Sequence, residues 1–146
     1  MKTSDITTVT VETTVNESID RVWKIWSDPE HIMQWNSASA DWYTPHAEND
    51  LRTGGRFLSR MSSRDGTVAF DFSGTYDIVE FHKRIKYTMD DNRKVEVLFT
   101  TEEDKTRITE TFEAENENSI ELQKNGWQAI LENFRKHVET LKGIAL

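Results

Sequence analysis

Cysteine is absent from the 146 residues of the sequence. Disulfide bonds, thiolate metal ligands and a cysteine nucleophile are therefore excluded, and such a composition suits a reducing compartment. Long apolar runs are absent as well. No apolar stretch follows Met1–Asp5 as a signal peptide requires, and none approaches the roughly 18 apolar residues of a membrane span. We expect a cytoplasmic protein that does not insert into a membrane.

Positive charge is scarce, because 18 Lys and Arg face 26 Asp and Glu for a net charge of −8. Such a surface repels phosphate backbones, so no nucleic-acid partner is expected. Proline and glycine are also few, and no repeat, low-complexity tract or flexible linker divides the chain. We expect residues 1–146 to form a single domain with one core.

Hydrophobic periodicity predicts a strand, two short helices, a series of strands and a long helix. Ile6–Val15 alternates as a half-buried strand, and Ser18 is the predicted N-cap of the first short helix. Asp28 and Pro29 begin the second, whose predicted buried side is Ile32, Met33 and Trp35. The later strand-like segments are Ala40–Thr44, Gly55–Ser63, Thr67–Phe81, Arg84–Asp90, Lys94–Thr101 and Thr106–Ala114.

The last helix, from Ser119, carries a long apolar stripe. Its members are Leu122, Trp127, Ile130, Leu131, Phe134, Val138 and Leu141. The turn signals between the strands favour antiparallel hairpins, so we predict an α+β helix-grip fold. In it, a curved antiparallel sheet of about six to seven strands wraps around the long C-terminal helix. A sheet that curls in this way diverges from the helix and leaves room for an apolar cavity.

Several ordered motifs resemble the SRPBCC (START and birch-pollen-allergen) superfamily, and within it the homologues of the activator of the heat-shock-protein 90 ATPase. One is the segment Asp50–Phe57, with its aspartate, double glycine and aromatic residue. The others are Val22-Trp23, Asp28-Pro29-Glu30, Trp35, Gly74-Thr75-Tyr76 and Gly126-Trp127. The resemblance covers Ile6 to Leu141 and departs at Phe81-His82, where the family often has a proline. It implies a helix-grip fold and hydrophobic-ligand binding, in a superfamily that also contains cyclases, dehydratases and chaperone regulators.

Strand parity and the apolar stripe predict the wall of the cavity, although aromatic residues at such spacing are more often plain core. The predicted ligand-binding residues are Trp35, Phe57, Met61, Phe70, Phe72, Tyr76, Val97, Phe99, Glu110, Trp127, Ile130, Leu131 and Phe134. Glu110 shares the parity of Ile108 and Phe112, so it is either buried in the cavity or on an edge strand. A buried carboxylate needs a partner, for which Arg56 and Arg60 are the candidates.

Cofactor and metal sites are not predicted. The four histidines, His31, His46, His82 and His137, lack metal-ligand spacing and are expected at the surface, with His46 in a loop over Thr44–Arg52 at the cavity mouth. Gly54-Gly55 is followed by a strand, which favours a tight turn over a phosphate loop. Gly126 implies a close approach to the helix or a packing requirement.

Three functions remain open from the sequence. The first is binding of a small lipid-like or polyketide-like molecule, with Tyr76, Glu110 or His46 as selective polar groups. The second is a cyclase or dehydratase that uses Glu110 or His46 as a general base, without a cofactor. The third is a protein-interaction module that acts on a chaperone. A cavity carboxylate or imidazole with a shifted pKa distinguishes the second from the first.

Overall fold

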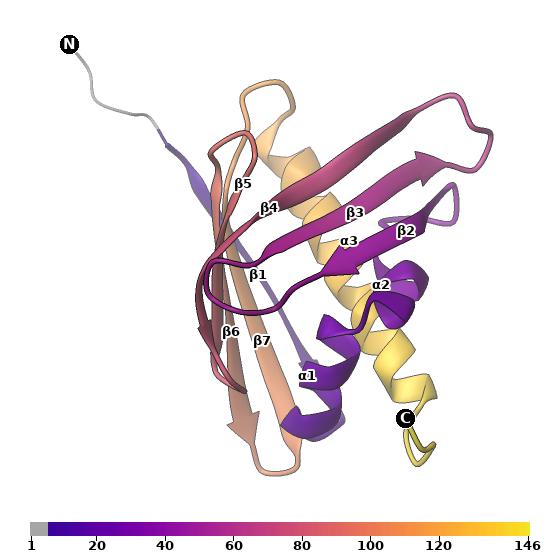
Figure 1. The fold of residues 1–146 in the computed structure, drawn as a ribbon, viewed down its shortest axis with the longest axis vertical. Coiled ribbons are helices and arrows are strands. Elements are labelled where there is room, and N and C mark those ends of the chain that lie inside the picture. Colours follow the sequence, from indigo (N-terminus) through magenta and orange to yellow (C-terminus); the bar gives the residue numbers. More distant parts are fainter. Residues whose placement is uncertain (1–5) are drawn as a thin grey trace.

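A computed structural model describes residues 6–146, which form a curled seven-stranded sheet and three helices (Figure 1). The segment Met1–Asp5, where no signal peptide is predicted, lies outside the described residues. In chain order the elements are β1 (Thr8–Val15), α1 (Ile19–Ser27), α2 (Pro29–Trp35), β2 (Trp42–Asn49), β3 (Arg56–Ser63), β4 (Ala69–Glu80), β5 (Arg84–Met89), β6 (Lys94–Glu102), β7 (Lys105–Glu113) and α3 (Ile120–Thr140). No helix of residues 6–146 is both long and apolar enough to cross a membrane.

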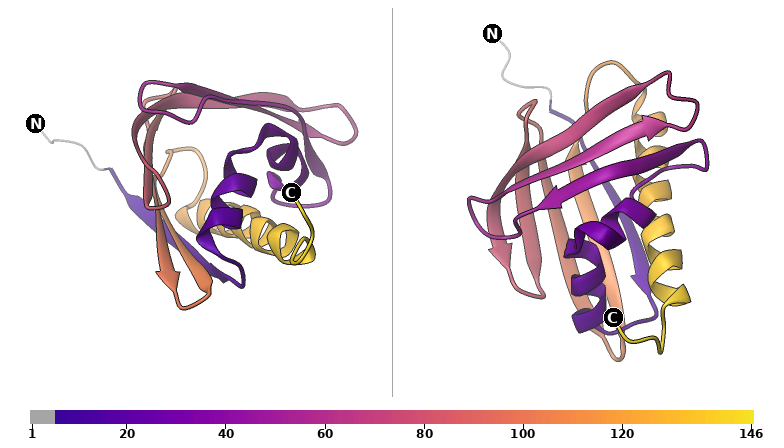
Figure 2. Two further views of the ribbon diagram at one scale, coloured as in Figure 1. Left: turned by 60° about the horizontal axis from the view of Figure 1, so that its bottom comes forward. Right: turned by 45° about the vertical axis from the view of Figure 1, so that its right-hand side comes forward.

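The sheet is antiparallel throughout, in the order β1-β7-β6-β5-β4-β3-β2. This confirms the predicted helix-grip fold and the hairpins between Arg84 and Phe112. Figure 2 shows the sheet bending around α3, with α1 and α2 beside that helix. Helix α1 contacts β7 and α2 contacts β2, so the two short helices link the two arms of the curl.

Strand β7 shows why the sheet has an apolar inner face. Its residues alternate in burial, with Ile108, Glu110 and Phe112 turned inward. It pairs with β1 on one side and β6 on the other, so it is not an edge strand. Glu110 therefore lies on the buried face, as its parity predicts.

The helix starts follow the predicted capping residues with one difference. Asp28 accepts a hydrogen bond from the backbone N–H of Glu30, and Ser119 accepts one from that of Leu122. Ser18 stands at the N-cap of α1, but its side chain makes no capping bond. Instead the Glu17 carboxylate accepts the Ser18 N–H at 2.8 Å, which holds the chain where the helix begins.

Three local predictions are wrong. Met33 is 40% exposed, because the buried face of α2 passes through Ile32 and Trp35. Leu122 is 59% exposed in the first turn of α3, where the buried residue is Gln123. The loop predicted over Thr44–Arg52 is strand up to Asn49, since β2 pairs with β3.

The turn between β2 and β3 depends on two glycines, as the sequence predicts. Gly54 has φ of +86°, a conformation that side-chain-bearing residues rarely adopt. A Cβ on Gly55 would collide with the carbonyl oxygen of Asp50. The double glycine is therefore a steric requirement of the turn.

Gly126 behaves differently, and replacing it is expected to stabilise the protein. A Cβ built on this helical glycine meets nothing within 4 Å among the described residues, so no close approach explains it. Gly126→Ala should raise the free energy of unfolding by about 1 kcal/mol, because alanine has the higher helix propensity. Urea denaturation measures the change, and Gly55→Ala is the control that should lose stability. A loss in Gly126→Ala would mean that this turn of α3 moves in the native state.

Candidate functional site

A cavity of about 660 Å³ lies between the concave face of the sheet and α3. Its volume is in the range of sites that hold small molecules. The first part of α3 contributes Gln123, Trp127 and Ile130 to its wall. The second part of the helix, with Leu131, Phe134 and Val138, is fully packed instead. The sheet and the helix thus diverge toward the N-terminal end of α3.

Most of the predicted wall residues do line this cavity. They are Trp35, Phe57, Met61, Phe70, Phe72, Tyr76, Glu110, Trp127 and Ile130. Phe70 is half exposed, so it stands at the rim. Four predicted residues lie in the packed core instead of on the cavity wall: Val97, Phe99, Leu131 and Phe134.

Two of these four, Phe99 and Phe134, pack against the short helices. Trp26 of α1 packs edge-on against Phe99 and Phe134, with ring centroids 5.5 and 4.9 Å away. Trp35 of α2 lies 4.8 Å from Phe134. Parity identifies the inward face of a strand, but it does not show where α1 and α2 fill the space. Contact with a ligand is therefore a prediction for the cavity residues alone.

Aromatic rings make the wall rigid. Trp127 stacks on Phe112 with centroids 4.0 Å apart and planes only 9° from parallel. Phe57 packs edge-on against Tyr87 at 4.8 Å, and Phe72 lies near Trp127 at 6.2 Å. Each pair of this kind stabilises the packing of the wall by about 0.5–1.5 kcal/mol beyond the burial of its area.

Strand β5 supplies wall residues that the sequence analysis missed. Ile85, Tyr87 and Met89 are buried and line the cavity, in strict alternation with half-buried neighbours. The alternation along Arg84–Asp90 is visible in the sequence and could have identified them. Trp26, Ile32, Asn36 and Ser59 are further wall residues. Ile32 lies on the predicted buried side of α2, and Ser59 has the parity of Phe57 and Met61, so both had a signal in the sequence.

Glu110 is the most unusual group of the site. It is 7% exposed, and burial raises the pKa of its carboxyl to about 8. The prediction that Arg56 or Arg60 pairs with Glu110 is wrong. Both lie on the opposite face of β3, where Arg56 pairs with Asp90 at 2.8 Å and Arg60 with Asp71 at 3.1 Å.

Two buried tyrosines line the cavity, and they differ in their hydrogen bonding. The hydroxyl of Tyr76 donates to Oδ1 of Asn49 at 2.6 Å. Burial raises the pKa of Tyr87 well above its ordinary value, and the nearby Glu110 carboxyl raises it further. Both phenols are therefore protonated at neutral pH.

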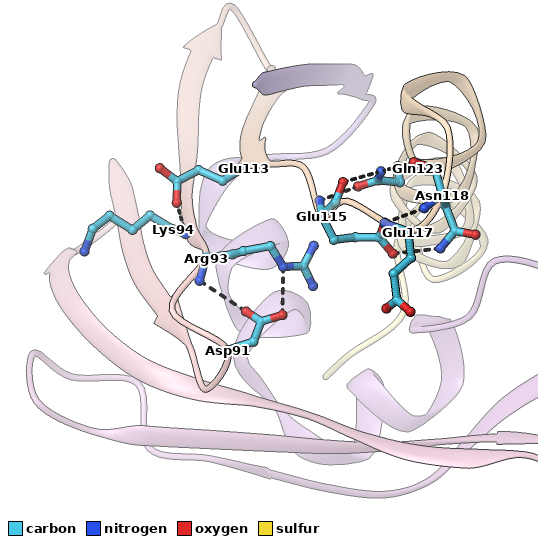
Figure 3. Close-up of polar contacts among 8 residues, drawn as sticks. All are labelled: Asp91, Arg93, Lys94, Glu113, Glu115, Glu117, Asn118 and Gln123. Carbon is cyan, nitrogen blue, oxygen red and sulfur yellow. Dashed lines mark hydrogen bonds and ion pairs between the residues drawn. The ribbon is translucent and has the colours of Figure 1, made fainter. Parts of the chain in front are cut away.

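The mouth of the cavity is polar (Figure 3). Arg93 donates from Nε to Asp91 at 2.8 Å, and its guanidinium is turned toward the loop that carries Glu115. Glu115 accepts hydrogen bonds from the backbone N–H groups of Glu117 and Asn118. Gln123 of α3 donates hydrogen bonds from Nε2 to the backbone carbonyl oxygens of Glu115 and Asn118, which connects the same loop to the helix.

The histidines lie away from the cavity wall. His46 is exposed on β2 and pairs with Glu48 at 2.7 Å, so its predicted place at the mouth is wrong. Nδ1 of His31 lies 3.0 Å from Nε2 of His137, a contact between α2 and α3 that their separation in sequence hides. No cluster of three metal-ligating side chains occurs in the described part of the chain.

Comparisons with known proteins agree with this fold. A sequence profile described as "Activator of Hsp90 ATPase homolog 1-like protein" matches residues 16–139. The solution structure of the AHSA1-like protein from Aeromonas hydrophila is 41% identical, with a TM-score of 0.87 over 93% of this chain and 94% of that one. A solution structure from Cytophaga hutchinsonii is 46% identical, with a TM-score of 0.80 over 94% and 96%.

A more distant crystal structure, from Nitrosomonas europaea, is 18% identical and shares the fold at a TM-score of 0.78, over 92% of this chain and 96% of that one. None of the curated proteins is similar enough to this chain to count as a match. The profile match spans most of the chain, and the two closer structures cover nearly all of it. The chain therefore belongs to the Activator of Hsp90 ATPase homolog 1-like family, within the SRPBCC superfamily.

Proposed function

We propose that the protein binds a small, largely apolar molecule, lipid-like or polyketide-like, in the cavity between the sheet and α3. The observation that carries this proposal is a cavity of about 660 Å³ whose wall is mainly aromatic and aliphatic. Burying apolar surface there contributes roughly 25 cal/mol per Å². The rigid wall spares the ligand the cost of ordering its site, which favours affinity.

Native mass spectrometry of protein purified without denaturation is expected to show a co-purified small molecule. Titration with the neutral dye N-phenyl-1-naphthylamine should give saturable binding and change the tryptophan emission. Met89→Trp should weaken dye binding at least tenfold, because Met89 is a buried wall residue and indole fills the space. Leu98→Trp is the matched control on the outer face of the sheet. Equal binding by both variants, or no binding by the wild type, would contradict the proposal.

One observation favours a cyclase or dehydratase as the second candidate. The cavity contains a buried carboxyl group whose pKa is about 8. At neutral pH this group is protonated, so it would act as a general acid rather than as the base expected from the sequence. Conversion of a carbonyl compound by the wild type, lost in Glu110→Gln, would favour this candidate.

A chaperone-regulating module is the third hypothesis, and it is supported by the family description alone. A chaperone that co-purifies with the protein in the same mass spectra would favour it.

A further inference from the structure

Two polar groups on the cavity wall have no partner. The Glu110 carboxyl and the Tyr87 hydroxyl make no hydrogen bond to any residue in the range 6–146, although each residue is only 7% exposed. Neither is among the fully enclosed polar atoms that lack a partner, so their oxygens are open to the cavity. A buried polar group without a partner costs free energy, which a ligand that supplies the partner recovers.

The two groups lie on the same side of the cavity. Tyr87 is on β5 and Glu110 on β7, and β6 separates the two strands. In the register Tyr87 is opposite Val95, while Glu110 is opposite Val97, the next inward residue of β6. Two strand spacings combined with the two-residue offset along the strands put the two backbone positions roughly 12 Å apart on the same face. A ligand atom between the two long side chains is within reach of both. The Coulomb effect of Glu110 on the pKa of Tyr87 agrees with this proximity.

The surroundings of Glu110 keep it neutral. Its neighbours on β1 and β6 are Val11 and Val97, and α3 presents Trp127 and Ile130 to the cavity. The charged or titratable groups that line the cavity from other elements are Tyr76, Tyr87, Asp91, Arg93 and Glu115, with Asp71 and Asp90 at the rim, where each is paired with an arginine of β3. The shift of the Glu110 pKa is caused by burial alone, so none of these groups supplies a compensating charge.

We propose that the cavity selects apolar ligands that carry a carbonyl group, whose oxygen accepts a hydrogen bond from the Glu110 carboxyl, with the Tyr87 hydroxyl as second donor. This inference rests on the proposed function. A carbonyl oxygen has two lone pairs and no proton, so it suits two donors. The remaining wall is apolar and suits the hydrocarbon part of the ligand.

Charged ligands match the site less well. Arg93 is the one Lys or Arg in the described wall of the cavity, and Asp91 already engages it at 2.8 Å, so a carboxylate or sulfate finds no free cation there. Asp71 and Asp90 at the rim are likewise paired, with Arg60 and Arg56. An ammonium ligand requires Glu110 to lose its proton in an apolar environment. A neutral carbonyl compound avoids both costs.

The test uses two neutral naphthalenes that differ at one carbon. The ketone is 6-propionyl-2-(dimethylamino)naphthalene, and its partner carries a propyl group in place of the propionyl group. We expect the wild type to bind the ketone roughly tenfold more tightly, which is the effect of one net hydrogen bond. In Glu110→Leu the preference should fall to within about twofold, and Tyr87→Phe should lose part of it. The C=O stretching frequency of the bound ketone should be lower in the wild type than in Glu110→Leu.

The pH dependence of binding distinguishes a preference caused by the Glu110 carboxyl from one caused by the shape of the cavity. The preference of the wild type for the ketone should fall as the pH rises through about 8, where Glu110 ionises. Glu110→Gln keeps a donor that does not titrate, so its preference should not change over the same range. Glu113→Gln, on the same strand but the opposite face, is the control and should behave as the wild type.

The outcomes distinguish this inference from the proposed function. Equal affinity of the wild type for the ketone and the propyl compound would overturn carbonyl selection and leave the cavity as an apolar site. A third naphthalene carries a primary aminopropyl group in place of the propionyl group. Tighter binding of this amine than of the ketone would also overturn carbonyl selection, in favour of cationic ligands. Failure of every naphthalene and of the phenylnaphthylamine dye to bind would overturn both proposals.

Discussion

Replacing Glu110 with glutamine is expected to abolish the fall in stability between about pH 4.5 and 8. The carboxyl has a pKa of about 8 in the folded protein, against an ordinary value of 4.5. Between these values the folded state keeps a proton that the unfolded state has lost. The free energy of unfolding of the wild type should therefore fall as the pH rises, by about 1.4 kcal/mol per unit and about 5 kcal/mol in total.

Urea denaturation at several pH values measures this slope. Glu110→Gln should lose the falling slope and keep only the opposite, smaller rise that the lowered pKa of His137 contributes up to about pH 6.5. Above pH 8 it should be the more stable protein. Glu113→Gln, on the opposite face of β7, is the control and should keep the wild-type slope. A wild-type stability that rises through this window would show that Glu110 is ionised in the folded state.

Truncation of Phe134 and of Trp127 should separate the packed core from the cavity wall. Phe134 is fully buried between Trp26 and Trp35, so Phe134→Ala is expected to lose about 3–5 kcal/mol. Trp127 stacks on Phe112 but also faces the cavity, so Trp127→Ala removes fewer contacts. It should fold and lose less than that range.

Chemical denaturation and dye titration give the two readouts. Trp127→Ala should change the affinity for the phenylnaphthylamine dye, because the cavity becomes larger beside α3. If Trp127→Ala lowered the free energy of unfolding as much as Phe134→Ala and left the dye affinity unaltered, the indole would lie in the solid core. The cavity would then lose its main aromatic wall.

The order of strands and helices could be predicted because each element has its own period in the sequence. Strand β7 alternates, α3 repeats at helical spacing, and Asp28 and Ser119 are local capping signals. The double glycine at Gly54 and Gly55 likewise depends on neighbours in the chain. Such information is local, and a single sequence contains it.

Features that depend on contacts between distant segments were beyond the sequence. Phe99 has the same parity as true wall residues, and its contact with Trp26 of α1 places it in the core. Arg56 does not pair with Glu110 because its side chain lies on the outer face of β3, where it pairs with Asp90. The contact of His31 with His137 also needs the packing of α2 against α3.

Because α3 is packed unequally along its length, its two halves are constrained differently, one by the stability of the fold and the other by the shape of the cavity. Its C-terminal half is enclosed by Trp26 and Trp35, so substitutions at Leu131 or Phe134 act on folding. Its N-terminal half borders the cavity, where a change at Ile130 alters the shape of the site at smaller cost to the fold. Under the ligand-binding function proposed above, a change of ligand needs substitutions at the N-terminal end of this helix only, and the residues that stabilise the fold at the other end can stay the same. The same division gives protein engineers a place to vary specificity without first having to restabilise the scaffold.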